Sequence, residues 1–284
     1  MTRGSLEGCV ALVTGANTGI GRVTALELAR RGARVIVGVR SLDKVQPLAA
    51  EVAALGCGSI VPLPLELGDF AAIRAFAASV LARREPLHIL INNAGVAGAR
   101  GMTASGFERT FGVNHIGTFL LTRLLTEHMV RTAAAGVQCR VVTVASRVHA
   151  RCKRFGYEGV RKPTRFTGVT EYQHSKLANL LFSAELARRL IGTGVNAYSL
   201  HPGVVATDIW RAVPWPVRSL MKLRPSVISA QKGAMTTLYC ATSASAAAET
   251  GLYYESERVK APSLLAQDAE LAAELWWRSE RWVA

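Results

Sequence analysis

The sequence predicts an α/β protein with a Rossmann-type doubly wound parallel β-sheet of about seven strands and helices on both faces. Two observations lead to this fold class. Short apolar runs alternate with helical patterns along the chain, and the first run passes directly into a glycine-rich turn within residues 10–21, VALVTGANTGIG. Apolar runs are typical of strands buried on both faces, and their alternation with helices is typical of parallel sheets. We expect one dinucleotide-binding domain over residues 1–284.

The first strand, turn and helix form a candidate phosphate site. Glycine permits positive φ and lets the backbone approach a pyrophosphate, while a helix N-terminus presents unpaired N–H groups and partial positive charge. An ordinary glycine-containing turn is the alternative when this segment is considered alone. The residues expected to bind the cofactor here are Gly15, Asn17, Thr18, Gly19, Ile20 and Gly21.

The second predicted strand, residues 34–39, is followed by Arg40. In an NAD site an acidic residue near this place binds the ribose 2′-OH, whereas a guanidinium pairs with the 2′-phosphate of NADP. We therefore predict NADP(H) in preference to NAD(H). Arg22 could add a second positive charge. The alternatives are that both arginines are exposed helix and loop residues, and that the nearby Asp43 supports NAD(H).

The alternation then continues to the C-terminus. Further strands are predicted at residues 59–65, 88–92, 140–145, 195–200 and 251–254. Helices are predicted at residues 43–55, 69–84, 172–191 and 229–241, with another long helical segment around Asn114. Glu66, at a strand end, could bind the adenine amino group or cap a helix. The small residues of Asn92-Asn93-Ala94-Gly95 let the backbone pass close to a cofactor.

Composition narrows the class of protein. The five scattered cysteines lack CxxC or Cys/His spacing, so neither a disulfide framework nor a metal site is predicted, and a reducing cytoplasmic location fits. No signal peptide or apolar span of about 20 residues is evident. The net charge of +14 suits an anionic ligand, an anionic membrane surface or a basic solvated surface. Zinc-finger, RRM and KH signatures are lacking, so nucleic acid is not a predicted partner.

Several motifs occur together in a fixed order and resemble the short-chain dehydrogenase/reductase family. They are TGANTGIG, the arginine after the second strand, NNAG, Asn114, Ser146, the YxxxK pair Tyr172/Lys176, and Pro202-Gly203. HPGVVATDI and the C-terminal GLYYESERVKAPSLLAQDAELAAELWW look most like the retinol-dehydrogenase-like branch. The spacing between Ser146 and Tyr172 is wider than the common family gap, and Glu66 stands where aspartate is more usual.

The resemblance implies catalytic roles for four residues. Tyr172 and Lys176 are one helical turn apart, so the ammonium could lower the pKa of the phenol from its usual value of about 10. In the family, Tyr172 would exchange a proton with the substrate oxygen, Ser146 would hydrogen-bond that oxygen, and Asn114 would hold a water that relays protons from Lys176. The further residues expected to contact the cofactor are Glu66, Leu67, Asn93, Ala94, Gly95, Tyr172, Lys176, Pro202, Val205 and Thr207.

The predicted function is NADP(H)-dependent hydride transfer between nicotinamide and the carbonyl or alcohol of an apolar substrate, such as a retinoid, lipid aldehyde or steroid-like compound. A non-catalytic NADP(H)-binding regulator is the alternative. Residues 147–171 and 207–229 are expected to form the substrate loops. The amphipathic residues 210–224 could serve as a substrate lid or rest on an anionic membrane, and Trp276, Trp277 and Trp282 pose a choice between core, partner and membrane. The sequence is compatible with either a monomer or a homo-oligomer.

Overall fold

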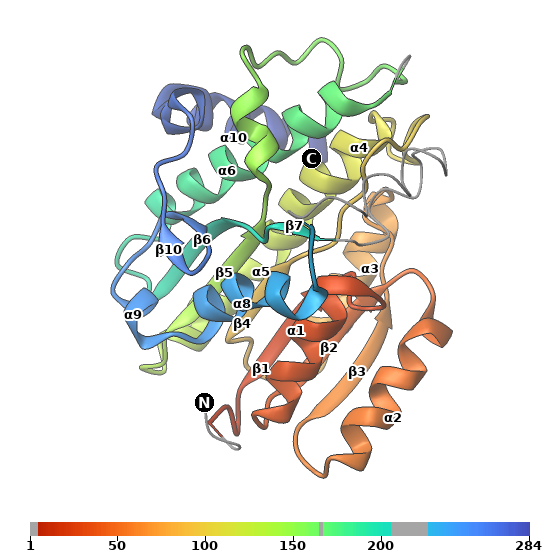
Figure 1. Cartoon of the computed structure of the whole chain (residues 1–284), viewed down its shortest axis with the longest axis vertical. Helices are drawn as coiled ribbons and strands as arrows, with labels where there is room; N and C mark the ends of the chain where they lie inside the picture. Colours follow the sequence, from red (N-terminus) through yellow and green to blue (C-terminus); the bar gives the residue numbers. More distant parts are fainter. Residues whose placement is uncertain (1–4, 165–166, 206–226) are drawn as a thin grey trace.

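A computed structural model describes residues 5–164, 167–205 and 227–284, and its described part is built on one eight-stranded sheet (Figure 1). The strand order is β10-β9-β6-β5-β4-β1-β2-β3. Every neighbouring pair is parallel except β10 with β9. The strands are β1 (Val10–Thr14), β2 (Arg34–Val39), β3 (Ser59–Pro64), β4 (Ile89–Asn92), β5 (Cys139–Val144), β6 (Val195–His201), β9 (Tyr253–Glu255) and β10 (Arg258–Val259). The predicted doubly wound sheet is confirmed, and the β9–β10 hairpin extends it beyond the last predicted strand.

Helices cover both faces of the sheet (Figure 1). Apolar residues on one face pack with α1 (Gly19–Arg30), α2 (Gln46–Ala54) and α8 (Ala230–Thr242). The other face packs with α3 (Phe70–Leu81), α5 (Gly117–Ala133), α6 (Val169–Arg189) and α10 (Ala269–Val283). All five residues of β1 are buried, because successive side chains enter opposite cores. That double burial explains why the first strand has a continuous apolar sequence.

The shorter elements complete the described chain. They are 3₁₀ turns at Leu42–Val45, Arg147–Arg151 and Leu264–Gln267, a π-helical turn at Gly112–Ile116, α4 (Arg109–Phe111), α9 (Ala244–Ala247) and the two-stranded pair β7 (Val204–Val205) and β8 (Val227–Ile228). The π-helical turn lies within the long helical segment predicted around Asn114. Asp69 caps α3 by accepting hydrogen bonds from the N–H groups of Ala71 at 2.9 Å and Ala72 at 3.4 Å.

The C-terminal tryptophans belong mainly to the core. Trp276 is buried and its ring lies 5.0 Å from that of Phe119, while the ring of Trp282 lies 5.9 Å from that of Phe107. Trp277 is 52% exposed and lies beneath the guanidinium of Arg281. Within the described ranges, none of the helices combines the length and apolar character needed to cross a bilayer. The predicted amphipathic segment 210–224 falls outside the described residues.

The strand order reverses between β1 and β4, and this reversal positions the site. In open α/β sheets a crevice forms beyond the carboxyl ends of the strands at such a switch point. Loops after β1, β2, β3, β4, β5 and β6 meet there, so motifs far apart in the sequence reach one place. Gly117 brings α5 close to one of these loops, because a Cβ at this position would overlap the carbonyl oxygen of Leu67.

We expect Gly117→Ala to destabilise the protein by about 1–3 kcal/mol, because the added methyl group must displace backbone beside Leu67. Urea unfolding measures the change. Gly159→Ala is the matched control, since a Cβ there meets no atom within 4 Å. Equal stability of the Gly117→Ala and Gly159→Ala proteins would contradict the expected overlap.

Candidate active site

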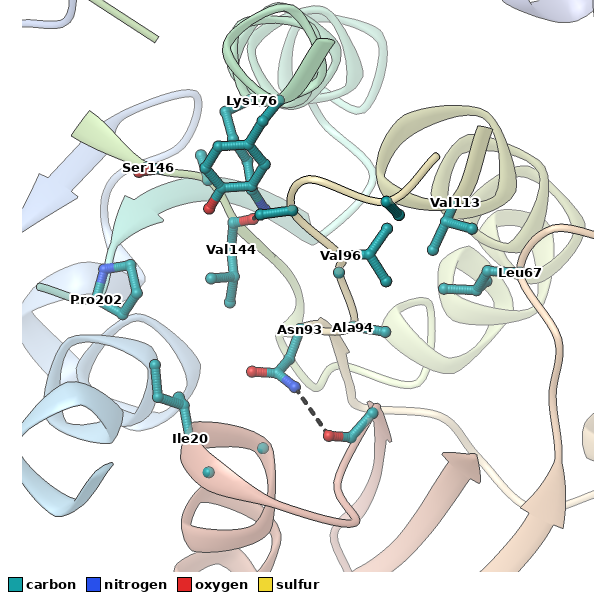
Figure 2. A pocket seen from close by; sticks show the side chains of 18 of the residues that line it. Ile20, Leu67, Asn93, Ala94, Val96, Val113, Val144, Ser146, Lys176 and Pro202 are labelled. Atoms are coloured by element: carbon teal, nitrogen blue, oxygen red, sulfur yellow. Dashed lines mark hydrogen bonds between the residues drawn. The ribbon is translucent and has the colours of Figure 1, made fainter. Parts of the chain in front are cut away.

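A cavity of about 710 Å³ lies at the carboxyl ends of the strands, and Figure 2 shows part of its lining. It brings together nearly all the residues predicted for the site. These are Gly15, Asn17, Thr18, Gly19, Ile20, Gly21, Arg40, Glu66, Leu67, Asn93, Ala94, Gly95, Ser146, Tyr172, Lys176, Pro202 and Val205. Asn114 lies behind the lining, and Thr207 falls outside the described residues.

The turn after β1 requires its glycines. Gly15 and Gly19 have φ values of 70° and 58°, in the left-handed region that glycine adopts without strain. A Cβ at Gly21 would overlap the side-chain amide of Asn93 and come within 2.6 Å of the Gly15 carbonyl oxygen. Thr18 makes no side-chain cap hydrogen bond at the start of α1. The turn therefore presents a close-packed, N–H-rich cradle that fits a pyrophosphate.

Thr14 joins this cradle to the loop after β4. Its hydroxyl oxygen accepts hydrogen bonds from the backbone N–H groups of Asn93 and Ala94, both at 3.0 Å. The Asn93 side-chain amide donates in return to the Thr14 carbonyl oxygen at 2.8 Å. Sequence reasoning identified Asn93 and Ala94 but missed Thr14. A threonine at the end of an apolar strand gives no signal of a partner almost eighty positions away.

Arg40 and Glu66 line the same end of the cavity. Arg40 has a side chain that is 61% exposed, and its Nε lies 3.9 Å from Glu66 Oε2. Glu66 Oε1 accepts a hydrogen bond from the Gly68 N–H at 2.9 Å, so this carboxylate supports the turn before α3. Arg22 points elsewhere and pairs with Glu51 at 2.6 Å, outside the cavity lining. Of the two arginines considered for the ribose phosphate, Arg40 lines the cavity and Arg22 does not.

Ser146, Tyr172 and Lys176 gather on the opposite wall. Lys176 is 2% exposed, and its ammonium donates to the Val144 carbonyl oxygen at 2.9 Å (Figure 2). Lys176 Nζ lies 5.6 Å from the centre of the Tyr172 ring. Tyr172 is also buried and shares a side-chain hydrogen bond with Ser146. The helix α6 thus presents the tyrosine and lysine together at the end of β5, as their spacing predicts.

Burial dominates the protonation of this pair. It raises the pKa of Tyr172 to about 12, although the hydrogen bond with Ser146 acts in the opposite direction. Burial also lowers the pKa of Lys176 to about 8. The spacing predicts that the ammonium lowers the tyrosine pKa, but in the structure desolvation raises it, and Ser146 is the group that acts in the opposite direction. At neutral pH Tyr172 is therefore protonated.

Asn114 lies in the π-helical turn and braces the site from behind. Its Oδ1 accepts from the Val96 N–H at 2.8 Å, while its Nδ2 donates to the Val96 carbonyl oxygen at 2.9 Å and to Ser175 Oγ at 3.0 Å. A Cβ at Gly95 would lie 3.3 Å from Asn114 Oδ1 and 3.6 Å from Lys176 Nζ. Glycine therefore allows the loop after β4 to pass between these two polar side chains.

One lining residue, His201 at the end of β6, was not assigned to the site from the sequence. Arg147, Val148 and Arg151 line the cavity from the 3₁₀ turn after β5 and belong to the expected substrate loop 147–171. Burial lowers the pKa of His201 to about 4, so its ring is neutral at pH 7. The basic character of residues 147–165 was visible in the sequence, but the direction of each side chain depends on the turn.

The switch-point cavity, glycine cradle and tyrosine–lysine pair define a dinucleotide-binding oxidoreductase. The sequence model of the short chain dehydrogenase family matches residues 9–215. Retinol dehydrogenase 12 of Mus musculus is 42% identical over 282 residues, which cover 97% of this chain and 86% of that protein. The chain belongs to the short-chain dehydrogenase/reductase family and to its retinol-dehydrogenase-like branch.

Solved structures agree with this assignment. An uncharacterised protein from Mycobacterium paratuberculosis is similar with a TM-score of 0.78 and 33% identity, covering 98% of this chain and 94% of that chain. The Pseudomonas aeruginosa RhlG/NADP active-site complex is similar with a TM-score of 0.71 and 27% identity, covering 89% and 96% of the respective chains. The family is one of oxidoreductases that bind a nicotinamide cofactor.

We expect Thr14→Val to lower stability by about 1–3 kcal/mol and to weaken cofactor binding, because two backbone N–H groups lose their acceptor. Urea unfolding and NADPH fluorescence titration measure the two effects. Thr14→Ser keeps the hydroxyl oxygen and serves as the control. If the valine protein bound NADPH as tightly as the serine protein, Thr14 would not organise the cradle.

Proposed function

We propose that this protein transfers hydride between NADP(H) and the carbonyl or alcohol group of an apolar small molecule. The observation that carries the proposal is the arrangement of one cavity. Its one end holds the glycine cradle and Arg40, and its other end holds Ser146, Tyr172 and Lys176. Charge pairing with a 2′-phosphate at Arg40 supports NADP(H) over NAD(H).

The protein's own residues supply proton transfer and orientation. Tyr172, protonated at neutral pH because burial raises its pKa, is the donor to the substrate oxygen during reduction. Ser146 hydrogen-bonds the tyrosine, which supports a role for its hydroxyl in holding the same substrate oxygen. Lys176, whose pKa of about 8 leaves it mostly charged at pH 7, stabilises the phenolate that remains after proton transfer. The nicotinamide supplies the hydride when bound.

The family resemblance supports further assignments to the cofactor. Lys176 is proposed to hold the nicotinamide ribose, and Val205 is proposed to donate its backbone N–H to the carboxamide. Glu66 and Leu67, which line the cavity near Arg40, are proposed to contact the adenine. The proposed proton relay through Asn114 uses its backbone carbonyl and a water, because the side-chain amide is already engaged with Val96 and Ser175.

An apolar substrate is supported by the aliphatic part of the cavity lining, to which Val96, Val113 and Val148 contribute. The mouse relative is a retinol dehydrogenase, which supports a retinoid, and a lipid aldehyde or steroid-like compound presents similar chemistry. A regulator that only binds NADP(H) needs the cradle but not Ser146 and Tyr172. Their presence at one wall therefore favours the enzyme.

Tyr172→Phe should lower reductase turnover by about 10²–10⁴-fold while changing NADPH affinity little, because it removes the proton donor and leaves the phosphate cradle intact. Steady-state assays with long-chain aldehydes and NADPH titration separate the two properties. Lys176→Ala is the companion variant and should impair both. Parental turnover by the phenylalanine protein would refute the proposed proton donor.

The unmutated protein should prefer NADPH to NADH by roughly ten- to hundredfold in kcat/KM, which corresponds to a charge-assisted hydrogen bond of about 1.5–3 kcal/mol. Arg40→Asp should abolish or reverse this preference. Arg22→Gln is the matched control, because Arg22 pairs with Glu51 outside the cavity and should not alter the cofactor ratio. Equal kcat/KM for both cofactors in the unmutated protein would overturn the assignment to NADP(H).

A further inference from the structure

We propose that Arg151 binds an anionic group of the substrate, so that the preferred substrate is an aliphatic aldehyde or ketone bearing a carboxylate at its far end. This inference rests on the proposed function, because it specifies the substrate class of the same cavity. It differs from a purely apolar substrate by one charge, placed at a defined distance from the reacting carbonyl. Four features of the described residues support it.

The first feature is the direction of the side chains in the 3₁₀ turn Arg147–Arg151. Side chains three residues apart eclipse each other in a 3₁₀ helix. Val148 and Arg151 form one such pair, and both line the cavity. His149 and Cys152 form the neighbouring pair, and both are buried in the protein. The periodicity of the turn therefore directs Arg151 to the cavity side.

The second feature is the anchoring of this turn beside the catalytic serine. His149 Nδ1 is hydrogen-bonded to the Ser146 carbonyl oxygen at 2.8 Å, and its Nε2 accepts from the Ser263 N–H at 3.2 Å. The His149 ring also packs edge-on against Tyr253 at 5.2 Å between centroids. These contacts hold the backbone that carries Arg151. A 3₁₀ rise of about 2 Å per residue separates Arg151 from Ser146 by about 10 Å along the turn.

The third feature is the charge balance at this end of the cavity. Arg147 is paired with Glu255, and Arg151 has no hydrogen-bond acceptor or carboxylate partner within the described ranges. Among the described residues that line the cavity, the acidic one is Glu66, which faces Arg40 at the end that holds the glycine cradle. The Arg151 guanidinium, which follows Ser146 along the turn, therefore has no carboxylate beside it among the residues that the structure describes. Anionic ligands are favoured at such a position.

The fourth feature is the aliphatic surface that lines the same cavity as this cation. Val148 lies one turn before Arg151, and Val96 faces the cavity from the loop after β4. An alkyl chain can cover these valines while its terminal carboxylate forms a bidentate pair with the guanidinium. Chemical complementarity therefore points to an amphiphilic carbonyl compound, with its carbonyl at Tyr172 and its carboxylate at Arg151.

A pair of aldehydes with equal chain length tests the proposal. Azelaic semialdehyde and nonanal share nine carbons and an aldehyde, but azelaic semialdehyde also ends in a carboxylate. The kcat/KM ratio of azelaic semialdehyde to nonanal is measured with NADPH at low and high salt for four proteins. These are the unmutated enzyme, Arg151→Gln, Arg151→Lys and Lys153→Gln. Lys153 belongs to the same basic segment but does not line the cavity, so its variant controls for loss of overall charge.

We expect a ratio of about ten or more for the unmutated enzyme, falling with added salt, because Arg151 is exposed and its charge is screened. Arg151→Gln should bring the ratio close to one. Arg151→Lys should restore part of it, and Lys153→Gln should retain it. A ratio near or below one in the unmutated enzyme, or an unchanged ratio in Arg151→Gln, would overturn the proposal.

A binding measurement separates this proposal from the proposed reaction. Calorimetry compares nonanoate with nonanol as ligands of the NADPH-bound protein, with no turnover required. Tighter nonanoate binding that Arg151→Gln abolishes supports the anion site even if neither aldehyde is reduced, in which case the proposed reaction fails alone. Equal binding of the two ligands rejects the anion site even if both aldehydes are reduced.

Discussion

Burial of the Lys176 ammonium is the constraint around which the site is organised. An isolated buried cation is strongly unfavourable, so it needs a close acceptor and an environment that tolerates its charge. The Val144 carbonyl oxygen at the end of β5 accepts its hydrogen bond at 2.9 Å, which fixes α6 against that strand. The same contact sets Tyr172, one turn earlier on α6, beside Ser146, which follows β5. Gly95 completes this arrangement, because a Cβ there would crowd Asn114 Oδ1 at 3.3 Å and would contact Lys176 Nζ.

The elements predictable from sequence are those whose causes are local. Buried parallel strands show continuous apolar runs, positive φ after β1 demands glycine, and the spacing of Tyr172 and Lys176 requires only a helix. These features position most of the site, because the doubly wound topology brings the strand ends together. The same local reasoning could not place Arg22, since its partner Glu51 lies on the next helix and draws the guanidinium away from the cavity.

Long-range polar contacts explain most of what the sequence did not reveal. His115, beside Asn114 in the π-helical turn, is buried and its Nε2 lies 3.2 Å from Ser279 Oγ on α10. The two residues are 164 positions apart, and neither belongs to a motif that identifies the other. The protonation of Tyr172 likewise depends on how deeply the phenol is buried rather than on its sequence spacing from Lys176. Proximity to Lys176 is visible in the sequence, whereas the desolvation that raises the pKa of the phenol requires the folded core.

The long segment between Ser146 and Tyr172 is held in place by hydrogen bonds to Glu108. This buried carboxylate accepts hydrogen bonds from Thr164 Oγ1 at 2.6 Å and from the Phe111 N–H at 2.7 Å. Its own N–H donates to the Val160 carbonyl oxygen at 2.7 Å. The far part of the inserted segment is therefore tied to the start of α4, while its near part is held at Ser146 through His149. Both parts of the segment are therefore anchored, and the near part contributes Arg147, Val148 and Arg151 to the cavity lining beside Ser146.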